Sequence, residues 1–167
     1  MQHRTMVQIQ TIASGELGTI QTLQMMRSLV LESLKLPRLV KVAATMYFKS
    51  PQDNMQLLKF TDEFLRSKFV YSSEAIETLQ TPEYMIRGLE MSGRLVGDCD
   101  DISTLHATLL TILGFETRFV AIRSMREESG YDHVYVEAKH NGDWIMYDIT
   151  LPLGTEIEYF GRFNIQV

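Results

Sequence analysis

The sequence predicts an α+β fold, in which a mainly helical N-terminal half packs on a central helix bearing the only cysteine, Cys99, and on a C-terminal antiparallel sheet. Apolar residues recur at helical spacing through residues 16–92, whereas residues 115–150 are rich in β-branched and aromatic side chains. An Asn-Gly pair at residues 141–142 divides the second region, and this pair is the strongest short signal for a hairpin.

The composition is that of a soluble globular protein. The chain has 167 residues, of which 45% are hydrophobic, so we expect one domain over 1–167, with 1–92 mainly helical and 93–167 holding the cysteine helix and the sheet. A net charge of -5 offers no basic face for phosphates, so no nucleic-acid partner is expected. No apolar run suits a membrane span or a signal peptide, which predicts a cytoplasmic protein without a membrane partner.

Four helices are expected before residue 93. The first covers about 19–34, on the spacing of its apolar residues. Pro37 suits the first turn of a second helix, because its missing N–H needs no partner there. The residues Ser50-Pro51-Gln52-Asp53 predict the start of a third helix, with Ser50 as the cap. The residues Thr81-Pro82-Glu83 predict a short fourth helix that ends near Gly93.

A buried helix is predicted over 98–113, with Gly114 as its C-terminal stop. The apolar residues at steps of three and four are Ile102, Leu105, Leu109 and Ile112. Cys99 then lies in the first turn, where unpaired N–H groups and the positive end of the helix dipole favour an anion. Such a position can lower the pKa of a thiol, and the thiolate is the nucleophilic form.

Strands are expected over 115–123, 133–139 and 144–150, with a polar loop over 124–131. A two-residue turn at 141–142 pairs residue 140 with residue 143, and the same register makes His133 and Asp148 diagonal neighbours on one face. Their side chains can then form a hydrogen bond. A four-residue turn leaves this register unchanged, whereas an odd-numbered turn would put the two side chains on opposite faces.

A thiol at a helix start, a histidine on a strand and an aspartate on the paired strand are what a Cys-His-Asp relay requires, because the base activates the thiol and the carboxylate orients the base. Each residue alone also has an ordinary structural explanation. The three acids beside Cys99 at positions 98, 100 and 101 oppose thiolate formation. We expect an ion pair with His133 to outweigh them, because the acids can point to solvent or cap the helix.

The other histidines offer no better base. His106 lies seven residues from Cys99, about 10 Å along the helix, and His140 flanks the turn. A metal site built from Cys99, His106, His133 and Asp100 is conceivable but lacks short ligand spacing, so neither a metal nor a cofactor is expected.

The runs at 97–101, 113–115, 132–137 and 144–150 resemble the transglutaminase-like superfamily, which has a papain-like cysteine core. The resemblance implies that Cys99 is the nucleophile, His133 the base and Asp148 the orienting acid. It implies cysteine-dependent acyl transfer or hydrolysis of an amide or peptide bond in a protein or peptide substrate, through a thioester. The Cys99 N–H and a second donor, Tyr71 or Gln80, would hold the oxyanion, although Tyr71 also suits the core.

Residues 69–71 and 77–82, which lead into the run at 97–101, are similar to small transglutaminase-like proteins encoded in tailed-phage and prophage gene clusters. This similarity implies a bacterial host cytoplasm or association with a virion, with phage structural proteins as partners. It also leaves open a non-catalytic structural or assembly component that uses the fold as a binding module. The chain shows no calcium loop like that of calcium-activated enzymes, so protein crosslinking is not the default expectation.

Overall fold

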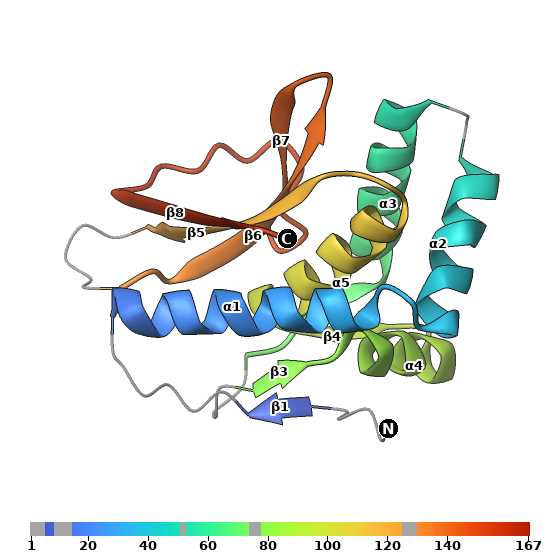
Figure 1. Ribbon diagram of the computed structural model, residues 1–167, viewed down its shortest axis with the longest axis horizontal. Coiled ribbons are helices and arrows are strands. Elements are labelled where there is room, and N and C mark those ends of the chain that lie inside the picture. The colour runs from blue at the N-terminus through green and yellow to red at the C-terminus, as the bar shows by residue number, and fades with distance from the viewer. Residues whose placement is uncertain (1–5, 9–14, 51–52, 74–77, 125–129) are drawn as a thin grey trace.

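The computed structural model describes residues 6–8, 15–50, 53–73, 78–124 and 130–167, and it has the predicted α+β architecture (Figure 1). Five helices are described: α1 (Glu16–Ser33), α2 (Pro37–Lys49), α3 (Asn54–Lys68), α4 (Pro82–Ser92) and α5 (Cys99–Ile112). The first four all contact α5, which also packs on strand β6 of the sheet. The cysteine helix is therefore the centre of the fold, as predicted. Among the described residues, no helix is both long and apolar enough to cross a membrane.

The starts of two helices follow their sequence signals. Thr81 caps α4 by accepting a hydrogen bond from the Tyr84 N–H, and Pro37 begins α2. The prediction that Ser50 caps the third helix is wrong. The Ser50 N–H still bonds the carbonyl of Met46, so Ser50 ends α2, and the Asp53 carboxylate caps α3 instead. Residues 51–52 lie outside the described residues.

The main sheet has four antiparallel strands in the order β7-β6-β5-β8. Their bounds are β5 (Thr117–Arg123), β6 (His133–His140), β7 (Asp143–Tyr147) and β8 (Gly161–Gln166). The hairpin turn is confirmed: Asn141 and Gly142 have φ of 52° and 94°, and His140 pairs with Asp143. Strand β7 ends at Tyr147, three residues before its predicted end, so Asp148 lies just beyond the strand.

Two short strand pairs lie on the helical side and were not predicted. Strand β1 (Met6–Gln8) pairs with β3 (Thr78–Gln80), and β2 (Phe69–Tyr71) pairs in parallel with β4 (Leu95–Gly97). Strand β4 leads directly into α5, so the second pair fixes the chain just before the cysteine.

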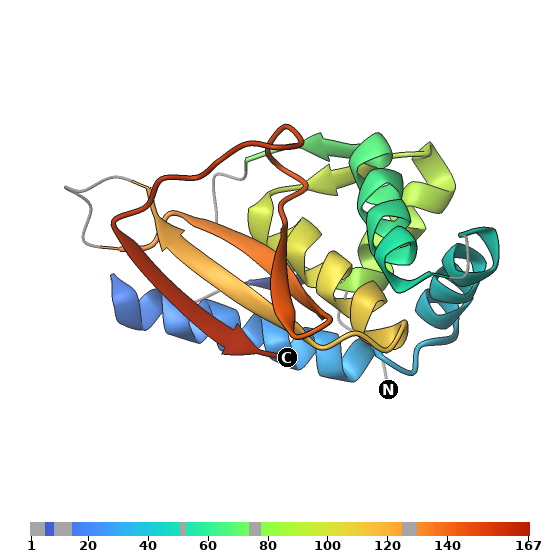
Figure 2. The same ribbon diagram turned by 90° about the horizontal axis from the view of Figure 1, so that it is seen from above.

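Helix α5 lies between the sheet and helices α2 to α4 (Figure 2). All residues from Asp101 to Leu110 are buried, which few helices achieve unless they are covered on every side. The predicted apolar face is buried at Ile102, Leu105 and Leu109, while Ile112 at the helix end is partly exposed. Helix α5 is thus enclosed from Asp101 onward, whereas its first two residues, Cys99 and Asp100, are only partly buried.

Candidate active site

Cys99 is the first residue of α5, and a capping box formed by Asp98 and Asp101 surrounds it. The Asp98 carboxylate accepts hydrogen bonds from the N–H groups of Asp100 and Asp101 at 3.1 and 3.3 Å, and the Asp101 carboxylate accepts one from the Asp98 N–H at 3.4 Å. These bonds do not use the Cys99 N–H. Among the described residues that N–H has no hydrogen-bond acceptor, so it is free to bind a ligand oxygen.

The chain before Cys99 is held by a buried carboxylate. Asp101 is completely buried and accepts hydrogen bonds from the backbone N–H and the side-chain amide of Gln80, both at 2.7 Å. Burial raises the pKa of Asp101 to about 7. A Cβ on Gly97 would lie 2.6 Å from Asp101 Oδ2, so only glycine allows this close approach.

The structure gives Gln80 a task other than the predicted oxyanion contact. Its amide nitrogen donates to Asp101 Oδ2 at 2.7 Å and to the Val96 carbonyl at 3.1 Å. Both amide hydrogens are therefore in use, and Gln80 is buried. It anchors the helix start and has no donor left for a substrate.

His133 and Asp148 form the hydrogen bond that the hairpin register predicts. His133 Nε2 lies 2.6 Å from Asp148 Oδ2. The other carboxylate oxygen accepts hydrogen bonds from the Thr150 N–H at 2.9 Å and the Thr150 hydroxyl at 2.7 Å. Although burial opposes it, hydrogen bonding from His133 and Thr150 lowers the pKa of Asp148. A buried carboxylate thus fixes the ring of His133 through Nε2 and leaves Nδ1 for another partner.

A residue that the sequence analysis missed holds the segment around Asp148. The Arg66 guanidinium, from α3, donates to the backbone carbonyl of Asp148 at 2.7 Å and to that of Ile149 at 3.3 Å, and it also bonds the carbonyl of Leu151. The Asp62 carboxylate lies 3.3 Å from Arg66 Nε and orients the guanidinium. Arg66 and Asp148 are 82 residues apart, so no local sequence signal could have linked them.

The sulfur of Cys99 has a different surrounding from the one expected. Sγ lies 3.4 Å from Asp100 Oδ1, and the structure records no hydrogen bond between Cys99 and His133. Burial and the Asp100 charge raise the pKa of the Cys99 thiol, although the Val134 N–H acts in the opposite direction. The expectation that all three acids turn away is wrong for Asp100. The surroundings of Sγ in this conformation therefore favour the thiol over the thiolate.

Tyr71 is exposed, so its assignment to the core is wrong. It ends β2 directly opposite Gly97, and 57% of its surface is accessible. Partial desolvation, followed by the negative charges of the nearby acids Asp98 and Asp100, raises the pKa of the Tyr71 hydroxyl. Tyr71 therefore keeps its proton and presents a donor close to the cysteine.

The other titratable candidates lie elsewhere. His106 is fully buried on α5 with its ring edge-on to Tyr147 at 5.7 Å, and burial lowers its pKa to about 3, so the ring is neutral. His140 is at the hairpin turn. Within the described ranges, no three His, Cys, Asp or Glu side chains come together in a way that could hold a metal ion.

Solved structures share this fold. A proposed cysteine protease from Cytophaga hutchinsonii has a TM-score of 0.54 and 19% identity, covering 67% of this chain and 36% of its own. A proposed protease from Parabacteroides distasonis has a TM-score of 0.59 and 13% identity, covering 76% of this chain and 26% of its own. The chain thus spans about a third and a quarter of the length of these two proteins.

No curated protein matches the chain in sequence. Residues 43–149, which are more than half of the chain, match the family model described as the transglutaminase-like superfamily. This match covers the helix start at Cys99, the strand that carries His133 and the turn that carries Asp148. The chain belongs to the transglutaminase-like superfamily.

Proposed function

We propose that the chain is a cysteine-dependent enzyme that forms a thioester on Cys99, with His133 as the general base and Asp148 as the group that orients it. The hydrogen bond of 2.6 Å between His133 Nε2 and Asp148 Oδ2, beside a cysteine at the start of a buried helix, carries this proposal. Family membership supports cysteine-based catalysis in general, and the assignment of the three roles rests on this geometry.

The resting contact of Cys99 with Asp100 requires one movement before reaction. The proposed movement is a rotation of the Cys99 side chain away from Asp100 Oδ1 and toward Nδ1 of His133, the ring nitrogen that Asp148 does not use. His133 then takes the thiol proton while Sγ attacks the substrate carbonyl carbon. The imidazolium returns this proton to the leaving amine, which yields the thioester and a neutral histidine.

Two donors suit the oxyanion that forms during the attack. The first is the Cys99 N–H, which the capping box leaves without an acceptor among the described residues. The second is the Tyr71 hydroxyl at the end of the neighbouring strand, and its raised pKa keeps it protonated. We assign Tyr71 this role in preference to Gln80, because both amide hydrogens of Gln80 are already donated.

The thioester is resolved by water or by an amine, which gives hydrolysis or acyl transfer. We favour hydrolysis of a peptide or amide bond, because both solved structures of the same fold are proposed proteases. The thioester chemistry is the same in both cases, so the two outcomes differ only in the second nucleophile.

A non-catalytic role, in which the fold serves as a binding module of a phage particle, is the alternative. The observation that favours it is the Asp100 carboxylate 3.4 Å from the sulfur, because a negative charge there opposes thiolate formation. A scaffold, however, has no need for the buried hydrogen bond between His133 and Asp148.

The test is acylation of Cys99 by p-nitrophenyl acetate, followed by mass spectrometry of the intact protein between pH 5 and 9. We expect acetyl-Cys99 at pH 6, with the rate lowered about 100-fold or more in His133→Ala and lowered less in Asp148→Asn. Asp143→Asn, exposed at the start of β7 in the hairpin, is the matched control and should react like the wild type. Identical alkaline profiles for the wild type and His133→Ala would favour the binding module.

A further inference from the structure

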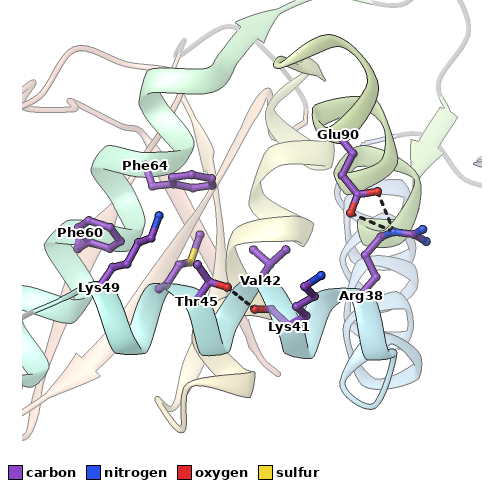
Figure 3. A pocket seen from close by; sticks show the side chains of 9 residues that line it. Arg38, Lys41, Val42, Thr45, Lys49, Phe60, Phe64 and Glu90 are labelled. Carbon is purple, nitrogen blue, oxygen red and sulfur yellow. Dashed lines mark hydrogen bonds and ion pairs between the residues drawn. The ribbon is translucent and has the colours of Figure 1, made fainter.

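A pocket between α2 and α3 contains none of the residues assigned to catalysis. Its volume is about 220 Å³. Figure 3 shows Phe60 and Phe64 from α3 facing Val42 and Thr45 from α2 across it. The walls are mainly apolar, and the three labelled apolar residues pack against the core cluster beneath them. The pocket therefore offers an apolar recess that opens at the surface of the helical half.

Unpaired positive charge lies beside this recess. Lys41 and Lys49 line the pocket, both are exposed, and neither has a carboxylate within ion-pair distance in the part of the chain that the structure describes. Arg38 and Glu90 also line the pocket, but they pair with each other at 3.1 Å, and Arg38 is held by Glu83 at 2.8 Å as well. Helix α2 contains no acidic residue, although the whole chain carries a net charge of -5.

We propose that this pocket docks an extended acidic segment of a partner protein, which inserts one bulky apolar side chain between α2 and α3 and places carboxylates on Lys41 and Lys49. The recess is smaller than the roughly 300–1,000 Å³ of a typical small-molecule site, but one large side chain fits it. Charge complementarity at its two lysines selects an acidic partner.

The spacing of the lysines specifies the segment further. Lys41 and Lys49 are eight residues apart on α2, which is about 12 Å along the helix axis, and Thr45 lies midway between them. In an extended segment, residues i-2 and i+2 are about 13 Å apart and project on the same side as residue i. The segment that fits is therefore acid–x–apolar–x–acid, with the apolar residue opposite Thr45.

The docking site would act independently of Cys99. Its lining residues come from α2, α3 and α4, whereas the candidate catalytic residues lie at the start of α5, on β6 and beyond β7. An anionic membrane could also bind the lysines, but a bilayer surface has no single side chain to fill the recess. Filling the pocket should abolish binding of the protein segment, whereas it should leave binding to an anionic membrane unchanged.

The test uses a fluorescein-labelled Glu-Ala-Phe-Ala-Glu peptide and fluorescence anisotropy on the full chain. We expect binding that weakens about tenfold or more in Thr45→Trp, which fills the recess from an exposed position, and in the double variant Lys41→Glu with Lys49→Glu. The charge-matched double variant Lys68→Glu with Arg94→Glu, away from the pocket, should bind like the wild type. Circular dichroism establishes that each variant is folded. Thr45→Trp tests the apolar recess and the double lysine variant tests the charges, so each tests a separate part of the proposed site.

Control peptides complete the design. Glu-Ala-Ala-Ala-Glu, which lacks the anchor, and Lys-Ala-Phe-Ala-Lys, which reverses the charge, should both bind about tenfold or more weakly. The inference is overturned by absence of binding at about 1 mM peptide, by equal binding of Glu-Ala-Ala-Ala-Glu, or by unchanged binding in the folded pocket variants. Sedimentation of the wild type and of Thr45→Trp alike with phosphatidylserine vesicles, without peptide binding, would assign the lysines to a membrane surface instead.

Discussion

The guanidinium of Arg66 donates a hydrogen bond of 2.7 Å to the backbone carbonyl of Asp148 and so ties helix α3 to the segment that carries the candidate orienting acid. The same guanidinium bonds the carbonyls of Ile149 and Leu151. Strand β7 ends at Tyr147, so sheet pairing does not fix Asp148. The hydrogen bonds from Arg66 and from Thr150 hold Asp148 in place of strand pairing.

Replacing Arg66 by lysine tests this positioning role. A single ammonium cannot reproduce the fork that reaches the carbonyls of Asp148 and Ile149, so we expect the acylation rate of Cys99 to fall about tenfold. The pH at which the rate reaches half its maximum should also shift, because the Asp148 carboxylate would no longer be fixed against His133. Arg87→Lys, at an exposed ion pair with Glu83, is the matched control. A wild-type rate and pH profile in Arg66→Lys would show that Arg66 has no such role.

The close contact between Gly97 and Asp101 predicts that a larger residue at position 97 lowers the stability of the fold. An added Cβ would lie 2.6 Å from Asp101 Oδ2 and 2.8 Å from Asp101 Cβ, and Asp101 cannot move without breaking its bonds to Gln80. Gly97→Ala should therefore lower the free energy of unfolding in urea by about 2 kcal/mol. Gly88→Ala, in α4, is the control. Its added Cβ would have no neighbour nearer than 4.0 Å, so this variant should be slightly more stable than the wild type. Equal stability of the two variants would contradict the close approach.

The buried Asp101 carboxyl predicts how stability depends on pH. Its pKa is raised from 3.8 to about 7, so between these values the folded state binds more protons than the unfolded state. The free energy of unfolding should therefore fall as the pH rises from about 4 to 7 through this group. Asp101→Asn should flatten the slope in that window, as measured by urea unfolding at several pH values. Asp53→Asn, at an exposed helix cap, should keep the wild-type slope.

The pairing of His133 with Asp148 could be predicted because register propagates. Once Asn141 and Gly142 form a two-residue turn, every pair from His140–Asp143 to Val136–Tyr147 is determined. Continuing the period-two alternation by one residue beyond β7 puts Asp148 on the face of His133. The start of α5 could be predicted as well, because the spacing of Asp98 and Asp101 suits a helix cap, and the structure shows that they form one. Local sequence signals therefore predict both features, although Arg66 of a distant helix helps to hold Asp148 in place.

Features that depend on distant chain segments could not be predicted. The Arg66 bonds join residues more than 80 positions apart, and strand β8 pairs with β5 across a long connection that carries no hairpin signal. The side-chain direction of Asp100 is a choice among rotamers that packing decides. Serine before proline suits a helix start and predicts a cap at Ser50, yet this residue ends α2 because its N–H bonds the Met46 carbonyl.

The last prediction concerns the Asp100 side chain, whose carboxylate lies 3.4 Å from Cys99 Sγ. Burial raises the pKa of the Cys99 thiol most, and the charge of Asp100 is the second cause. Asparagine keeps the shape of this side chain and removes its charge. Asp100→Asn should therefore lower the pKa of the thiol by about one unit, and iodoacetamide should alkylate Cys99 about tenfold faster at pH 8. Asp143→Asn, exposed in the hairpin, should leave the rate unchanged.

An unchanged rate in Asp100→Asn would mean that Sγ already faces His133 in solution and that the contact with Asp100 is a minor conformer. A faster rate that disappears when His133→Ala is added would mean that the two groups compete for the sulfur. Asp100 would then hold the thiol protonated until a substrate displaces it. The Asp100 charge would in that case keep Cys99 unreactive in the absence of substrate, and its position would be compatible with catalysis.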